Sequence, residues 1–138
     1  MQAYAWETVE GVQVESVMLS GKRRAVKGIW IRWLSKVGAD ASGTPLYGLR
    51  HFTAEPEGEI PIHNHPYHQT VFILTGRFVC YVGNSENGEI EESRVCGPGE
   101  VVFSPAWEPH GMKNLSSTEP ATFLCCIGRS DETVGSGS

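Results

Sequence analysis

The stretch GEIPIHNHPYHQTVFILTG, residues 58–76, contains three of the five histidines of this 138-residue chain. His63 and His65 are separated by one residue, and Gln69 comes four positions after His65. Side chains two residues apart in a strand point to the same face, so both imidazoles can reach one point if this segment is extended. An HxH pair alone is weak evidence for a metal site, because such pairs also arise by chance.

A second stretch, GEVVFSPAWEPHGMKN at residues 99–114, gives the first one a partner. It contains a fourth histidine, His110, together with Gly99, Pro105 and Asn114 at regular spacings. Two histidine-containing segments of matched form, separated by a β-rich region, are a much stronger signal than either segment alone.

Together the two stretches resemble the paired motifs of the cupin superfamily. The usual first motif is Gly, five residues, His-x-His, three or four residues, Glu, six residues and Gly. This chain has one residue fewer between Gly58 and His63, and Gln69 stands at the Glu position. The usual second motif is Gly, five residues, Pro-x-Gly, two residues, His, three residues and Asn, and here Trp107 replaces its second Gly. The resemblance spans about residues 26–128 and implies an all-β, single-domain double-stranded β-helix, the cupin jelly-roll barrel.

The rest of the sequence independently predicts a small β-sandwich or barrel. Short β-branched or aromatic runs alternate with turn-forming segments, no window shows a helical apolar period, and there are no internal repeats. Gly and Pro, at 16 and 8 residues, are abundant enough for many tight turns. The first predicted strand is an alternating stretch that begins with Val12, Val14 and Val17. The others are residues 28–34, 46–54, 70–74, 77–83, 100–104 and 121–128.

Length predicts one domain, because a single core saturates near the size of an ordinary domain. We expect a domain over residues 1–130, made of a short N-terminal strand arm (1–25) and a barrel (26–128). The Gly/Ser-rich residues 131–138 are predicted to be a disordered tail. The basic residues Lys22, Arg23, Arg24 and Lys27 are predicted to lie in a solvated turn between strands.

Composition excludes several classes of partner. The net charge of −5 argues against nucleic acid, and no apolar run approaches the roughly 18 residues of a membrane span. The first residues lack the basic and apolar regions of a secretory signal, so a cytoplasmic location is expected. None of the four cysteines is in CxxC spacing, which predicts reduced structural thiols.

The cupin resemblance implies a metal site made of His63, His65, Gln69 and His110. The chain also resembles small single-domain cupins with four neutral ligands, which have a His where this chain has Gln69. His68 is the alternative fourth ligand, but in those relatives the residue at its position is typically a carboxylate that is not a ligand, which favours Gln69. His51 is predicted to be a packed or exposed histidine inside a strand rather than a ligand.

One divalent transition metal per chain is expected at this site. Neutral imidazoles suit Fe(II), Mn(II), Ni(II), Cu(II) or Zn(II), and a carboxamide oxygen favours Mn or Fe. Because all four ligands are neutral, the cation keeps its charge and attracts an anionic small-molecule substrate. The predicted pocket-lining residues are Val71, Ile73, Met112, Cys125 and Arg50.

Two classes of enzyme fit such a site, and the substrate is not identifiable from the sequence. The first is a dioxygenase acting on a small enolisable or aromatic anion at a mononuclear metal. The second is a non-redox isomerase or lyase that uses the cation as a Lewis acid on a sugar or uronate. A non-catalytic small-molecule-binding protein ranks third. His68, Tyr67 and Tyr81 are the candidate general bases.

The N-terminal residues predict a homodimer. Small cupins commonly associate through an N-terminal strand, and Tyr4, Trp6 and residues 12–14 form an apolar edge that a partner's sheet would cover.

Overall fold

The structure, a computed structural model, describes residues 1–129. The predicted Gly/Ser tail therefore lies outside the described residues. Within residues 1–129 no helix is long and apolar enough to cross a membrane. The elements are η1 (Trp6–Thr8), β1 (Val12–Gln13), β2 (Ser16–Leu19), β3 (Lys22–Ala25), β4 (Lys27–Val37), β5 (Tyr47–His63), β6 (Tyr67–Thr75), β7 (Phe78–Gly83), β8 (Ile90–Cys96), β9 (Val101–Ser104), β10 (His110–Asn114) and β11 (Ala121–Arg129).

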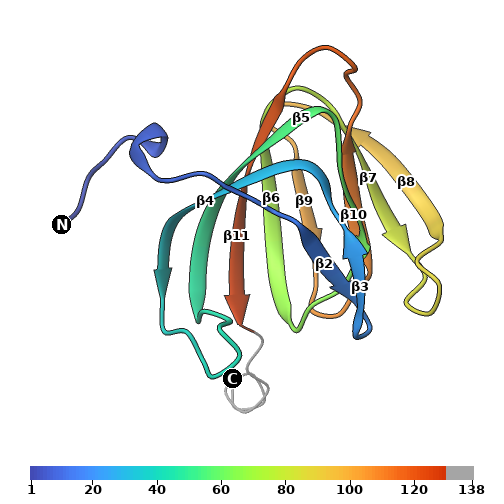
Figure 1. The fold of residues 1–138 in the computed structure, drawn as a ribbon, viewed down its shortest axis with the longest axis horizontal. Coiled ribbons are helices and arrows are strands. Elements are labelled where there is room, and N and C mark those ends of the chain that lie inside the picture. Colours follow the sequence, from blue (N-terminus) through green and yellow to red (C-terminus); the bar gives the residue numbers. More distant parts are fainter. Residues whose placement is uncertain (130–138) are drawn as a thin grey trace.

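Of the strands described in residues 1–129, β2 and β3 form a separate two-stranded sheet, and the other nine form an antiparallel sheet that curls into a nearly closed barrel (Figure 1). Its strand order is β8-β7-β10-β5-β11-β6-β9, with β4 also paired to β5 and β1 paired to β4. Strands that are distant in sequence lie side by side, which is the jelly-roll arrangement that the sequence predicted. The all-β prediction is confirmed.

Strand β5 is the element that joins the two halves of the barrel. Residues 47–54 pair with β4 and β11, whereas residues 59–63 pair with β10. The sequence predicted a strand that ends at residue 54, and that end is wrong, because the strand bends over residues 54–59 and continues to His63. Glu57 has a φ of 60° at the bend. A Cβ atom on Gly58 would lie 2.5 Å from the carbonyl oxygen of Gly28, so only glycine fits.

The side chain of Asn114, the last residue of the second motif, holds this bend in place. It is fully buried, and its Nδ2 donates to the carbonyl oxygens of Ala54, Glu55 and Glu119. Its Oδ1 accepts from the backbone N–H of Ser116. A buried amide with this many partners stabilises one backbone path, so Asn114 has a structural role.

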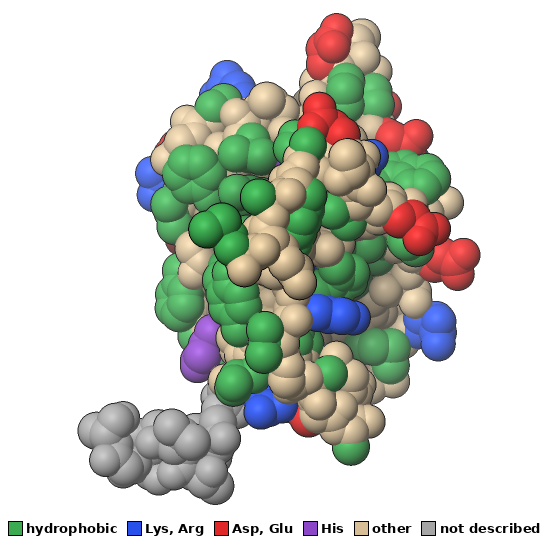
Figure 2. All heavy atoms as spheres, turned by 90° about the vertical axis from the view of Figure 1, so that its left-hand side faces the viewer, with side chains coloured by type: hydrophobic (Ala, Val, Ile, Leu, Met, Phe, Trp, Pro, Cys, Tyr) green, Lys and Arg blue, Asp and Glu red, His purple; other side chains and the backbone are tan. Residues whose placement is uncertain are grey.

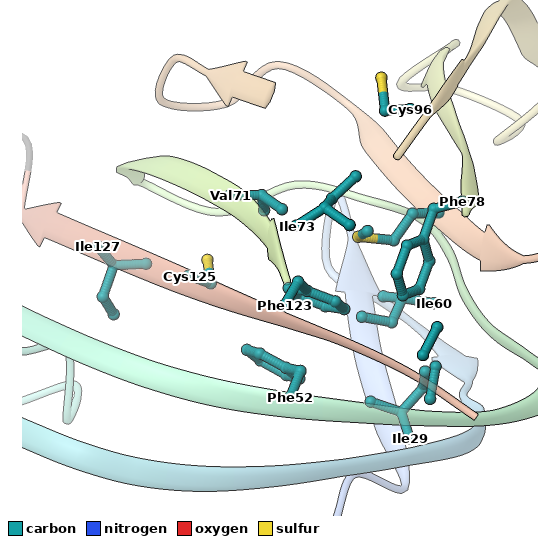
Figure 3. Packing of buried hydrophobic residues seen from close by; sticks show 13 residues of the cluster. Ile29, Phe52, Ile60, Val71, Ile73, Phe78, Cys96, Phe123, Cys125 and Ile127 are labelled. Carbon is teal, nitrogen blue, oxygen red and sulfur yellow. The ribbon is translucent and has the colours of Figure 1, made fainter. Parts of the chain in front are cut away.

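The hydrophobic core fills the inside of the barrel, and its residues are those that the alternation along each strand turns inward. Every second residue of β6 and β11 is buried, and the intervening residues face outward. Phe52 and Phe123 stack with ring centroids 4.8 Å apart at the centre of the cluster (Figure 3). All four cysteines are free thiols, as expected.

Residues 16–25 form a hairpin, β2–β3, that lies over one end of β5. The basic cluster was predicted to be a solvated turn, but Lys22–Ala25 is strand β3, and the turn consists of Ser20 and Gly21 with φ of 47° and 84°. The hairpin is tied to β5 because Arg24 Nη1 donates to the carbonyl oxygen of Ile62, at 2.7 Å.

The N-terminal arm packs on the outer face of its own barrel. Trp6 stacks on His51 with ring centroids 4.1 Å apart, and Arg32 donates to the carbonyl oxygens of Glu7 and Val9. His51 is buried beneath this contact, so it is a packed histidine, as predicted. The arm is not one continuous strand, because residues 6–8 form a 3₁₀ turn and only Val12–Gln13 pairs with β4.

Candidate metal centre

The pairing of β10 with β5 brings the histidines of the two motifs together. His110 begins β10 and lies directly opposite His63, the last residue of β5. His65 follows two residues later and lies beyond the end of the strand. The expectation that both histidines of the HxH pair lie in one strand is therefore wrong, because only His63 lies in β5. The nitrogen atoms of the three imidazoles that could bind a metal all lie within 4.8 Å of one another.

In each of the three imidazoles, the Nδ1 atom forms a hydrogen bond with a backbone carbonyl oxygen, and this bond fixes the orientation of the ring. Because a carbonyl oxygen only accepts, each Nδ1 must carry the proton, and each Nε2 presents a lone pair. Nε2 of His110 is buried and has no hydrogen-bond partner among the described residues. Such Nδ1–H···O=C contacts are the usual support of metal-binding histidines. The three carbonyls are those of Pro61 at 2.9 Å from His63, Tyr67 at 3.0 Å from His65 and Glu108 at 2.7 Å from His110.

The environment also keeps these imidazoles neutral. Burial lowers the pKa of all three, that of His63 well below its usual value and that of His65 to about 4. The neighbouring His110 lowers the pKa of His63 and His65 further. Neutral imidazole is the form that binds a metal, so the site is ready for a cation at neutral pH.

Gln69 faces the same point from β6. Its side chain is 9% exposed, and its Oε1 lies 3.1 Å from Nε2 of His65. In the tautomer described above, both atoms can offer a lone pair to one cation. Two donors about 2.1 Å from one ion at right angles lie about 3 Å apart, which matches this spacing. The residues present therefore fit a divalent transition metal.

His68, the alternative fourth ligand, lies on the other side of β6. Alternation along the strand buries Gln69 and exposes His68. Nδ1 of His68 accepts a hydrogen bond from the backbone N–H of Ala106, at 2.9 Å. The geometry thus favours Gln69 as the fourth donor.

The histidines open into a cavity of about 280 Å³. Arg50, Met112 and Cys125 line it, as the sequence predicted, together with Gln69 and the three histidines. Val71 instead lines a second cavity of about 250 Å³, which shares Gln69, His110 and Met112 with the first. Ile73 lies in the packed core (Figure 3) and lines neither cavity.

The hairpin that forms one wall of this cavity was not predicted from the sequence. Ser16, Val17 and Met18 of β2 line it, and Asn64 donates to the carbonyl oxygen of Met18, at 3.0 Å. The available signal was the Ser20–Gly21 dipeptide between two short runs, which is typical of a turn.

Trp107, which replaces the second glycine of the second motif, is strained. Its φ is 68°, in the left-handed region that favours glycine. Its backbone N–H donates to the carbonyl oxygen of His65, at 2.8 Å. The loop before His110 is therefore bonded directly to the segment that contains the HxH pair. The indole itself is exposed.

None of the three candidate bases is well suited to accept a proton in the cavity. His68 faces outward, and Tyr67, which stacks on His65, has its pKa raised by burial. Burial and the neighbouring Glu59 raise the pKa of Tyr81 to about 12. The Tyr81 hydroxyl donates to Glu59 at 3.1 Å. A substrate that arrives already ionised needs no such base.

Comparison with known families assigns the chain. The cupin domain model matches residues 50–127, which include both histidine segments. The chain is a cupin. This confirms the family resemblance read from residues 58–76 and 99–114. No curated protein sequence matches the chain.

Solved structures with this cupin's fold share little sequence with it. The polyketide cyclase RemF from Streptomyces resistomycificus has a TM-score of 0.68 at 23% identity, covering 92% of this chain and 78% of its own. A cupin-2 domain protein from Rhodospirillum rubrum has a TM-score of 0.63 at 21% identity, covering 94% and 77%. Oxalate oxidase has a TM-score of 0.58 at 19% identity, covering 75% of this cupin and 52% of the oxidase. At these identities the likeness concerns the fold.

Proposed function

We propose that this cupin is a mononuclear metal-dependent dioxygenase acting on a small enolisable or aromatic anion. The observation that carries the proposal is the convergence of three neutral imidazoles, each fixed through Nδ1, on a point that Gln69 also faces. Three histidines and one amide oxygen suit Mn(II) or Fe(II), and the open positions of such an ion admit a bidentate ligand or a ligand with O₂.

The charge of the cavity supports an anionic substrate. No Asp or Glu is among the described residues that line it. The imidazoles are neutral and Arg50 is cationic, so the wall carries a positive charge even before a metal is added. An anion is the complementary ligand.

The rest of the cavity wall is mostly apolar, which is evidence that the substrate carries an apolar group as well as a charge. Val17, Ile31, Phe52 and Phe123 line the cavity and leave few groups to hold water. A bound divalent ion would supply Lewis acidity and, for iron or manganese, redox chemistry. The chain itself contributes the orientation of the donors, the exclusion of water and the positive charge.

A non-redox reaction of the same anion is the second candidate. RemF, one of the most similar folds found here, is a polyketide cyclase, and the cavity's lack of an acidic base is compatible with Lewis-acid activation alone. Oxalate oxidase, another structural neighbour, supports the first candidate.

One experiment separates the two. The protein is purified without chelator, its metal is identified by mass spectrometry, and O₂ uptake is measured against diketones, catechols and unsaturated uronates. A dioxygenase consumes O₂ with its substrate and stops under nitrogen. Turnover that continues under nitrogen supports the isomerase or lyase. A protein without metal, or one that turns over equally well with chelator, contradicts both candidates.

We further propose that the chain forms a homodimer through the outer face of the barrel. Phe72, Val101 and Phe103 are 42%, 58% and 59% exposed, and Phe72 lies directly opposite Val101. Leu124, opposite Phe72, connects this patch to His51 and hence to the arm. Figure 2 shows that hydrophobic side chains cover much of the face that carries the arm. Exposed apolar area of this kind is typical of an interface.

Light scattering at micromolar concentration is expected to give the mass of two chains. Replacing Phe72 and Phe103 with lysine should give a monomer, because the charges would be buried in the interface. Ile90→Lys, an equally apolar exposed site on β8, is the control and should remain dimeric. A monomeric wild-type protein would refute the proposal.

A further inference from the structure

Among the described residues, Arg50 is the one charged side chain in the wall of the cavity that the three histidines open into. It lies in β5 between Trp33 of β4 and Cys125 of β11, which are its direct partners across the sheet. The alternation of β5 turns it inward, and it is only 8% exposed. A guanidinium at this depth must be compensated, because burying an unpaired charge is costly.

The contacts of Arg50 within the protein compensate its charge only weakly. Its guanidinium carbon is 5.4 Å from the Trp33 ring centroid and 5.1 Å from that of Phe52. Nη2 donates to the sulfur of Cys125 at 2.9 Å, and Nε is buried without a hydrogen-bond partner within residues 1–129. Burial raises the pKa of Cys125, so this neighbour is a neutral thiol and not a counterion.

The usual partner of a buried arginine is missing here. Among residues 1–129 the ion pairs within 4.0 Å are Arg94 with Glu100 and Arg129 with Asp40, and neither includes Arg50. The planar N–H fork of arginine matches a carboxylate through two parallel hydrogen bonds. The cavity therefore contains an arginine fork that has no carboxylate partner among the described residues, beside the three histidines that could bind a metal.

We propose that Arg50 anchors a carboxylate of the substrate and thereby selects for organic acids with an apolar body. The inference rests on the proposed function, since it places the carboxylate on Arg50 and the reacting part of the molecule at the histidines. The apolar wall, with Phe52, Ile60 and Phe123, accommodates the rest of the molecule. Arg50 is a specificity-determining residue in this arrangement, and the thiol of Cys125 gives up its hydrogen bond when the acid binds.

Benzoate and its neutral counterpart benzamide test this assignment. Binding is measured by calorimetry and by the change in tryptophan fluorescence, to which Trp33 contributes because it lies against Arg50, in both chelator-treated and metal-loaded protein. We expect benzoate to bind wild-type protein and benzamide to bind at least about tenfold more weakly. Arg50→Gln should weaken benzoate about 10- to 100-fold in both forms, because a charge-assisted hydrogen-bond pair is lost.

Two further variants complete the test. Arg50→Lys keeps the charge without the planar fork and should fall between wild type and Arg50→Gln, which also covers the case that Arg50→Gln does not fold. Arg77→Gln removes an exposed arginine in the turn before β7 and should leave the affinity unchanged. Metal content is measured in each variant and should equal that of wild type.

The outcomes separate this inference from the proposed function. Equal binding of benzoate and benzamide, no benzoate binding to wild type, or wild-type affinity in Arg50→Gln overturns the role of Arg50. A wild-type protein that binds no metal overturns the proposed function, yet its benzoate affinity still tests Arg50 directly.

Discussion

His110→Ala is expected to abolish stoichiometric metal binding while the barrel remains folded. His110 supplies a buried lone pair with no protein partner, so its removal takes away a donor and leaves the sheet pairing of β10 with β5 and β7 intact. His63→Ala should behave in the same way. The measurements are metal content by mass spectrometry and thermal unfolding with and without added metal.

The size of the effect follows from ligand linkage. Metal at about 1,000 times its dissociation constant stabilises wild type by about 4 kcal/mol, and this stabilisation should be absent in His110→Ala. Without metal the variant should lose only about 1–3 kcal/mol, because the carbonyl of Glu108 loses its donor and a small cavity opens.

His68→Ala is the matched control. His68 also lies near the site in sequence but faces outward, so this variant should retain full metal content. Loss of metal in His68→Ala would show that the fourth donor has been assigned wrongly. A metal-free wild-type protein without a cooperative thermal transition would contradict the separation of the metal site from the scaffold.

Substitutions of Gln69 are expected to change metal affinity and anion affinity separately. Gln69→Ala removes the amide oxygen and should weaken metal binding at least about tenfold. Even residues that only hydrogen-bond to the ligands, without touching the metal, change metal affinity by about this factor. The three histidines should still bind metal, with a more open face. Metal affinity is measured by competition with a chromophoric chelator, and anion affinity with azide or oxalate.

Gln69→His and Gln69→Glu differ in the charge of the new side chain, and we expect this charge to give them different affinities for anions. Gln69→His restores the ligand set of four-histidine relatives, stays neutral and should retain metal and much of any activity. Gln69→Glu should bind metal at least as tightly, since a carboxylate adds a negative charge. It should bind azide or oxalate more weakly, because that same charge reduces the pull of the cation on an anion.

Unchanged metal and anion affinities in Gln69→Ala would contradict this role. Gln69 would then not contact the ion, and the contact of its Oε1 with His65 would be an ordinary hydrogen bond made by a flipped amide. That outcome would leave the three-histidine site in place and would require another group or water in the fourth position.

The fold and the meeting of His63, His65 and His110 could be predicted from the sequence, the fold from local alternation and the histidines from the resemblance to the cupin motifs. Alternation of apolar residues gave the inward face of β6, on which Gln69 and Val71 lie and from which His68 is excluded. The spacing of residues 58–76 and 99–114 gave the family, which the cupin match over residues 50–127 confirms. The strands that the sequence did not predict, β3, β8 and β10, are short or rich in polar and charged residues, so their periodic signal is weak.

At the bend in β5, prediction from the local sequence fails. Residues 54–59 contain Pro, Gly and acidic residues, which favour a turn. The strand continues through them because Asn114, distant in sequence, bonds the carbonyls of Ala54 and Glu55 at the bend. Tertiary hydrogen bonds overrode the local preference.

By itself, the sequence determined the all-β class, the cupin family and the residues that can reach a metal, because these follow from spacing and alternation within single segments. Only the tertiary structure decided which residues of different segments meet. Strand register places His110 opposite His63, and it places Arg50 between Trp33 and Cys125 with no carboxylate beside it among residues 1–129. Register is set by the packing of the whole barrel, and a one-residue shift would turn each of these side chains to the opposite face.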